Sequence, residues 1–246
     1  MIQNFKNQIK GILYNAEFGH SVLGLFYNPF YLTRRALNNK IRNYSKFING
    51  NILDVGCGSK PYKRFFNHTE YTGIDTNQSG HNHKNEEIDV FFVEEKIPFK
   101  NENFDSIVCF EVIEHVFTPL GFLTEINRVL RNEGYFLVTM PFTWDEHEQP
   151  FDYARYSSFG IKHLLESNGF IVIENKKTLN DIRAVFQIMN CYLFKSLKYF
   201  HRSLFGSLII GFIFYFPLNL LAQLLFYITP ENNDFYIDNI ILARKR

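Results

Sequence analysis

An apolar segment that runs directly into a glycine turn most constrains the fold of this chain. The segment spans residues 52–55, and the turn that follows it is Gly56-Cys57-Gly58. Glycine adopts positive φ and lets the backbone approach a ligand closely, and Pro61 suits the first turn of a helix. We therefore predict a strand, a turn and then a helix over residues 60–66. Two glycines alone are as typical of an ordinary turn as of a nucleotide site.

Alternating strand and helix patterns continue along the chain. Amphipathic helices are predicted at residues 120–130 and 159–167, the second ended by Asn168-Gly169, a pair typical of a left-handed helix cap. Strands separated by helices indicate an α/β fold whose parallel sheet is covered by helices on both faces. The further strands are predicted at residues 71–74, 88–93, 104–110, 135–140, 170–174 and 236–243.

A carboxylate ends the second predicted strand. Asp75 follows Gly58 by 17 residues. An acidic residue at about 20 residues from a glycine turn accepts hydrogen bonds from the hydroxyls of a ribose. Asp75 is therefore a candidate ribose ligand. The alternative is an N-cap of the following helix.

Four stretches in a fixed order resemble the class I S-adenosylmethionine-dependent methyltransferases, in particular the type 11 group. The resemblance covers residues 50–141. The stretches are LDVGCG at 53–58, then GID at 73–75, then IPF, NFDSIV and EVIEHV between 97 and 116, and finally NRVLR through Gly134 to Val138.

The resemblance implies a Rossmann-like seven-stranded sheet whose last strand is antiparallel and lies beside the fifth. It also implies S-adenosyl-L-methionine as the cofactor. Asp75 would hold the ribose, and the segment near Glu111 and His115 would lie beside the reactive methyl group. The residues that would bind the cofactor are Asp54, Gly56, Gly58, Asp75 and Glu111.

Two positions depart from the family pattern. The usual third glycine is replaced around Lys60, so the following helix is expected to start differently. An Asp that contacts the adenine in many relatives is replaced by Val93. Asp89 or Glu94 substitutes for it, or apolar contacts alone hold the ring.

The loop at residues 141–156 carries the candidate catalytic residues. It follows a predicted strand at the edge where open α/β sheets bind ligands. Its run of His147, Asp152 and Arg155 resembles a subset of bacterial methyltransferases. We expect His147 to be the base, since its unperturbed pKa lies near neutrality. Asp152 or Arg155 would orient it or grip the acceptor, and the alternative is a structural ion pair that closes the loop.

The three cysteines do not indicate a metal centre. They are Cys57, Cys109 and Cys191, and none forms a Cys-x-x-Cys pair. This spacing fits neither a disulfide framework nor a zinc site. No metal site is therefore expected from the sequence.

Residues 203–230 contain no charged side chain. A run of this length is sufficient for a membrane span of about 20 residues. Because predicted strands precede and follow it in one sheet, both ends must lie on the same side of a membrane. We predict a monotopic or re-entrant helical hairpin that turns at Pro217. The alternative is an insertion packed on the protein itself or a dimer interface.

These patterns divide the chain into four segments. Residues 1–50 form an N-terminal helical region broken at Pro29, and residues 51–180 form the S-adenosylmethionine-binding core. Residues 181–234 are the apolar helical insertion, which is expected to associate with a membrane. Residues 235–246 return as the last strand of the core sheet.

The predicted activity is methyl transfer to a small or lipid-linked acceptor, at oxygen rather than nitrogen or carbon. A net charge of +1 gives no basic field for nucleic acid. The N-terminus does not resemble a signal peptide, so we expect a cytoplasmic protein at the inner face of the membrane, peripheral or monotopic. The alternatives are an NAD(P)-dependent oxidoreductase and a non-catalytic, membrane-associated binding protein with the same fold.

Overall fold

The structure is a computed structural model that describes residues 18, 21–77, 80, 86–92 and 96–246. It divides into two compact units. The sheet unit contains residues 40–177 and 238–246. The helical unit contains residues 1–39 and 178–237.

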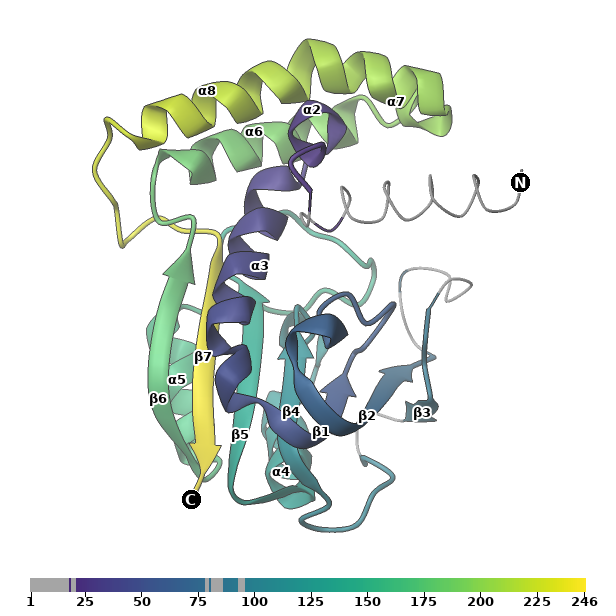
Figure 1. Cartoon of the computed structure of the whole chain (residues 1–246), viewed down its shortest axis with the longest axis vertical. Coiled ribbons are helices and arrows are strands. Elements are labelled where there is room, and N and C mark those ends of the chain that lie inside the picture. The colour runs from purple at the N-terminus through teal and green to yellow at the C-terminus, as the bar shows by residue number, and fades with distance from the viewer. Residues whose placement is uncertain (1–17, 19–20, 78–79, 81–85, 93–95) are drawn as a thin grey trace. The chain divides into compact units, whose positions relative to one another are not determined.

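A seven-stranded sheet forms the centre of the sheet unit, in the order β3-β2-β1-β4-β5-β7-β6 (Figure 1). Strands β1 to β5 pair in parallel, and β7 runs antiparallel beside β5. The predicted fold class, including the antiparallel last strand beside the fifth, is confirmed. The strands are β1 Asn49–Val55, β2 Asn67–Thr76, β3 Val90–Phe92, β4 Phe104–Phe110, β5 Leu130–Pro141, β6 Phe170–Thr178 and β7 Asp238–Lys245.

Helices cover the sheet. Helices α4 (Pro119–Val129) and α5 (Ser158–Ser167) lie behind it in Figure 1. The buried face of α4 follows helical spacing, because Phe122, Leu123, Ile126 and Val129 all join the core. On the other face, α3 (Tyr31–Tyr44) ends with its Tyr44 hydroxyl donating to Glu174 of β6 at 2.8 Å.

The helix predicted over residues 60–66 is wrong. Only a 3₁₀ turn, η2 (Lys63–Phe65), follows β1. Lys60 has a left-handed φ of 50°, so it cannot belong to a right-handed helix, and the residues after it form only this short turn. Its Nζ lies 2.5 Å from a carboxylate oxygen of Asp89. Gly73 leaves room for the lysine stem, because a Cβ there would lie 2.3 Å from Lys60 Cε.

The helical unit combines the N-terminal residues with the insertion that precedes β7. Buried amides hold its parts together. The Gln187 side chain donates to Pro29 O at 3.0 Å and accepts from Thr33 N–H at 3.1 Å, and Asn190 Nδ2 donates to Asn219 Oδ1 at 2.9 Å. Besides the start of α3, the helices are α2 Gly24–Tyr27, α6 Ile182–Ser196, η4 Phe200–Arg202, α7 Leu204–Ile210, η5 Gly211–Tyr215 and α8 Phe216–Phe226.

The prediction that the apolar run turns at Pro217 is wrong. Instead, α7, η5 and α8 form one helical stretch, Phe205–Phe226, of 22 residues. Pro217 follows the π turn η5 and lies at the start of α8, where its missing N–H does not end the helix. The chain reverses at residues 197–203, between α6 and α7, so α6 and α8 pack against each other.

This helical stretch exposes a broad apolar face. Its length and composition would allow it to cross a membrane. Only 28% of its most apolar 18-residue segment is buried within the protein. Large apolar side chains project from it, among them Phe205, Phe212, Ile213 and Leu224, each more than half exposed. Contiguous exposed apolar patches of this kind are uncommon on soluble monomers.

Candidate active site

The carboxyl ends of three neighbouring strands lie at one level of the sheet. Val55, the last residue of β1, pairs with Ile74 of β2 and with Cys109 of β4. The residues that follow, including Gly56, Asp75 and Glu111, therefore meet at the same edge. β1 and β4 are adjacent here, where the strand order reverses, and open α/β sheets bind their ligands at such a point.

A cavity of about 310 Å³ opens at this edge. Its wall contains four of the five predicted cofactor residues, including Glu111. The predicted base, His147, also lines it. The lining residues are Gly56, Gly58, Asp75, Thr76, Glu86, Phe92, Glu111, Val112, His115, Val116, Phe122, His147, Glu148 and Phe151.

The glycine turn presents bare backbone to this cavity. Gly56 has a φ of 70°, and a Cβ there would lie 2.2 Å from Val112 Cγ2. Gly58 has a φ of 45° and faces open space. Its N–H donates to Asp75 Oδ2 at 3.1 Å. The turn and the Asp75 carboxylate are thus adjacent, an arrangement that fits a nucleoside whose ribose lies at Asp75.

Asp54 lies beneath the turn and not in the cavity wall. Its carboxylate is 3% exposed and accepts a hydrogen bond from Tyr71 Oη at 2.6 Å. Burial raises the pKa of Asp54 to about 7, against the opposing effects of the Tyr71 hydrogen bond and the Lys60 charge. Asp54 therefore supports the turn from below.

The adenine contact is not assigned. Asp89, one candidate, accepts hydrogen bonds from Lys60 Nζ and from Gly73 N–H at 2.7 Å. These bonds tie its carboxylate to the framework of the sheet. The other candidate, Glu94, and the departing position Val93 lie outside the described residues.

Two buried carboxylates follow β4. Glu111 has a left-handed φ of 56°, and its Oε1 is buried without a hydrogen-bond partner among the described residues. Burial, with the nearby charges of Asp238 and Glu114, raises the pKa of Glu111 well above its usual value. Glu114 is fully buried, and burial raises its pKa to about 8. Both of its carboxylate oxygens also lack a hydrogen-bond partner among the described residues.

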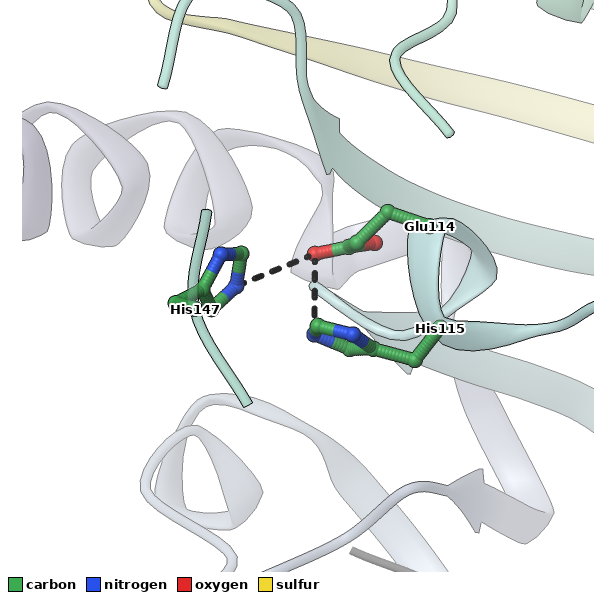
Figure 2. A group of neighbouring side chains, drawn as sticks. All are labelled: Glu114, His115 and His147. Carbon is green, nitrogen blue, oxygen red and sulfur yellow. Dashed lines mark ion pairs between the residues drawn. The ribbon is translucent and has the colours of Figure 1, made fainter. Parts of the chain in front are cut away.

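Two imidazoles face Glu114 (Figure 2). Its Oε1 lies 3.7 Å from His115 Nε2 and 3.9 Å from His147 Nε2. The two rings are edge to face, with centroids 4.7 Å apart. His115 Nδ1 lies 2.8 Å from Phe151 O, and burial lowers the pKa of this imidazole. The Nε2 atoms of both rings therefore point at one carboxylate oxygen.

An ion pair holds the loop that carries His147. The Arg155 guanidinium contacts both carboxylate oxygens of Asp152, at 2.5 and 2.7 Å. Asp152 Oδ2 also accepts from the His147 backbone N–H at 2.9 Å and lies 3.3 Å from its Nδ1. Burial would raise the pKa of Asp152, but the Arg155 and His147 hydrogen bonds outweigh it and bring the pKa to about 2.

Asp152 and Arg155 therefore form the structural ion pair that was the alternative prediction, and through it they orient His147. Neither residue lines the cavity. The same loop is tied to the segment after β4, because the Tyr153 and Ala154 N–H groups donate to Glu114 O at 2.9 and 3.1 Å. We treat Asp152 and Arg155 as positioning residues.

Glu114 is the site residue that the sequence prediction omitted. The sequence around Glu114 did contain an indication, because this acidic residue lies between the apolar Ile113 and Val116, both of which are buried. A charged residue in the middle of a buried apolar segment is rare unless it has a function or a partner. The pairing of His147 with His115 needed the fold, since 32 positions separate them in the sequence numbering.

A family model described as "Methyltransferase domain" matches residues 31–181. The chain belongs to this family. It is a class I S-adenosylmethionine-dependent methyltransferase, and S-adenosyl-L-methionine is its cofactor. The match decides against the nicotinamide-dependent alternative.

Curated relatives resemble the chain over part of its length. The fatty-acid O-methyltransferase of Mycolicibacterium smegmatis is 35% identical over 99 residues, which cover 36% of each protein. An uncharacterized protein of Methanocaldococcus jannaschii is 33% identical over 117 residues, 42% of this chain and 45% of that protein. The matches thus span less than half of these relatives.

Solved structures support the fold. The [4+2]-cyclase SpnF superposes with a TM-score of 0.55 at 15% identity, covering 86% of this chain and 81% of that one. Phosphoethanolamine N-methyltransferase 2 of Haemonchus contortus, in complex with S-adenosyl-L-methionine, gives 0.52 at 17% identity, covering 94% and 59%. At these identities the likeness concerns the fold alone.

The buried Asp54 predicts a pH-dependent stability. Its carboxyl has a pKa of 3.8 in the unfolded chain and about 7 in the folded one. The contribution of the protonated Asp54 carboxyl to stability is therefore complete below about pH 4 and is lost as the pH rises through 7. Asp54→Asn still accepts from Tyr71 but does not titrate. The free energy of unfolding of Asp54→Asn, relative to that of the wild type, should therefore increase by about 2–3 kcal/mol as the pH rises from 5 to 8.

Urea unfolding at several pH values checks this prediction. Asp234→Asn, in an exposed loop, is the matched control and should show no such drift. A constant difference between Asp54→Asn and wild type across the range would mean that Asp54 is ionised in the folded protein.

Proposed function

We propose that the chain transfers the cofactor methyl group to a hydroxyl oxygen of a lipid-linked or otherwise amphiphilic acceptor, with His147 activating that hydroxyl. The observation that carries this proposal is the composition of one cavity. Its wall holds the glycine turn and Asp75 at one part, and His147 and His115 at another. Donor and acceptor groups would therefore meet within a single enclosed space.

The cofactor, when bound, supplies a methyl group on a positively charged sulfur, which is already a good electrophile. The chain mainly has to position the acceptor and exclude water. Gly56 and Gly58 leave backbone open to the methionine part, and Asp75 is placed to accept from the ribose hydroxyls. Phe92, Phe122 and Phe151 line the cavity with apolar surface, which limits access of water.

Activation of the hydroxyl is assigned to His147. Its ring lies in the cavity wall, and its Nδ1 side faces Asp152 Oδ2 at 3.3 Å. The Asp152–Arg155 pair fixes the ring so that Nε2 faces inward toward Glu114. An oriented imidazole is the usual means of drawing a proton from a hydroxyl nucleophile.

Two observations support an amphiphilic acceptor. One curated relative is named as a fatty-acid O-methyltransferase. In this chain, the exposed apolar face of Phe205–Phe226 is suited to the interfacial region of a membrane. Because β6 precedes this helix and β7 follows it within one sheet, the helix cannot cross the bilayer once. We propose a protein that lies on the inner face of the membrane.

Transfer of label tests the activity. With cofactor labelled on the methyl group and a bacterial membrane lipid extract, the wild type should move label into a lipid-soluble product whose mass rises by one methylene. His147→Ala should lower turnover by ~10²-fold or more and leave cofactor affinity unchanged. The matched control is His163→Ala, on the exposed side of α5. Full turnover in His147→Ala would remove this residue from the mechanism.

Vesicle sedimentation tests the membrane surface. The full chain should sediment with phosphatidylcholine and phosphatidylglycerol vesicles in 0.5 M salt, a condition that screens charge attraction. The double variant Phe205→Asp and Phe212→Asp should bind at least tenfold more weakly, since each phenyl ring contributes ~1.5–3 kcal/mol on burial. Phe159→Asp, at an equally exposed phenylalanine of α5, is the control. Equal binding of the double variant and wild type would contradict the proposal.

A further inference from the structure

We infer that Glu114, His115 and His147 form a binding site for one divalent transition-metal cation, of the Zn²⁺ or Mn²⁺ class. The inference rests on the proposed function for the acceptor and replaces one step of it: His147 would act as a ligand of the cation, in place of a free base. The candidate ligand atoms are Glu114 Oε1, His115 Nε2 and His147 Nε2, all within 4.8 Å of one another.

The triangle of ligand atoms has a suitable size. Two of its edges are 3.7 and 3.9 Å, both measured from Glu114 Oε1. The centre of such a triangle lies roughly 2.2–2.5 Å from its corners, a few tenths of an ångström beyond the ~2.0–2.2 Å of Zn–N and Zn–O bonds. Small side-chain rotations would close that difference. Two imidazoles and one carboxylate on one face are a typical set for divalent transition metals.

The Nδ1 atom of each ring has oxygen neighbours on the side away from Glu114, as is usual for histidines that bind metals through Nε2. His115 Nδ1 lies 2.8 Å from the carbonyl oxygen of Phe151, which can only accept a hydrogen bond. His147 Nδ1 lies 3.3 Å from both Asp145 O and Asp152 Oδ2. The carbonyl partner of His115 places that ring's proton on Nδ1 and leaves a lone pair on Nε2 facing Glu114. The same tautomer of His147 would donate to one of its two oxygen neighbours, although an Arg155 nitrogen also lies 3.5 Å from its Nδ1. Metal-bound histidines show this second hydrogen bond almost without exception.

The burial of Glu114 supplies an independent reason for a cation. The residue is 0% exposed, and neither carboxylate oxygen has a hydrogen-bond partner in the part of the chain that the structure describes. A buried carboxyl group whose oxygens have no hydrogen-bond partner is costly in either protonation state. Protonated histidines do not resolve this, because both Nε2 atoms lie beyond hydrogen-bond distance and two imidazolium rings at 4.7 Å would repel each other. A single cation would satisfy the carboxylate and both lone pairs.

The three ligands leave coordination positions for the acceptor. His115 and His147 line the cavity, so a cation held between them would be within reach of the space where donor and acceptor would meet. A hydroxyl bound to such a cation would have a lowered pKa and would lose its proton to water. Its oxygen then bonds to the methyl carbon while the carbon–sulfur bond breaks, and that electron pair stays on sulfur.

Metal binding by the full chain tests the inference. The protein is treated with a chelator, dialysed against micromolar Mn²⁺ or Zn²⁺, and its metal is counted by mass spectrometry. We expect one equivalent per chain and a higher melting temperature with metal than without it. Glu114→Gln and His147→Ala should each weaken binding by at least ~10²-fold, beyond the effect of losing a supporting hydrogen bond. Glu146→Gln, an exposed residue of the same loop, should bind as the wild type does.

The outcomes separate this inference from the proposed function. Absence of bound metal, or equal binding by wild type, Glu114→Gln and His147→Ala, would overturn the metal site. If methyl transfer then persists at full rate in chelator, the proposed function stands with His147 as a free base. If one equivalent of metal binds but no lipid accepts a methyl group, the metal site stands and the proposed acceptor is wrong. Circular dichroism of both variants checks that they fold.

Discussion

The site depends on three parallel strands ending at the same level of one sheet. Val55 lies opposite both Ile74 and Cys109, so the glycine turn, Asp75 and Glu111 follow their strands side by side. No single segment could place these groups together. The register does so because a parallel ladder fixes which residues are neighbours. The cavity, the buried carboxylates and the histidine pair all lie beyond this common edge.

The second constraint is the way the 141–156 loop is fastened. Its backbone donates twice to the Glu114 carbonyl, and its Asp152–Arg155 pair fixes the imidazole of His147. Histidines from two distant segments thereby meet at one buried carboxylate. Hydrogen-bonded support of this kind gives a site a fixed geometry before any ligand arrives. The backbone hydrogen bonds and the ion pair therefore set the position of His147 beside Glu114.

Much of the fold was predictable because the sheet is buried. Every predicted strand has a counterpart in the structure, since apolar runs bounded by turn residues leave few alternatives. The helix predicted after β1 does not form, and neither the left-handed backbone at Lys60 nor its contact with Asp89 could be inferred from the sequence. The turn at Pro217 was also wrong, because a π turn placed before a proline lets the helix continue.

The backbone of the candidate site is easier to predict from the sequence than the partners of its side chains. Glycines and Asp75 are readable from spacing, whereas the position of Asp54 beneath the turn depends on its bond to Tyr71. Asp152 and Arg155 were expected to orient His147 or to grip the acceptor, with a structural ion pair as the alternative. The structure shows the ion pair, and its Asp152 carboxylate lies beside His147 Nδ1. Whether a polar side chain faces a cavity or supports one that does is decided by tertiary packing.

The central claim is that the cofactor sulfur faces the histidine pair from the glycine turn. A crystal structure of the full chain with S-adenosylhomocysteine tests it most directly. The account predicts ribose hydroxyls within hydrogen-bond distance of Asp75 and the sulfur directed toward His115 and His147. A ribose bound away from Asp75, or a sulfur directed away from the two imidazoles, would contradict it.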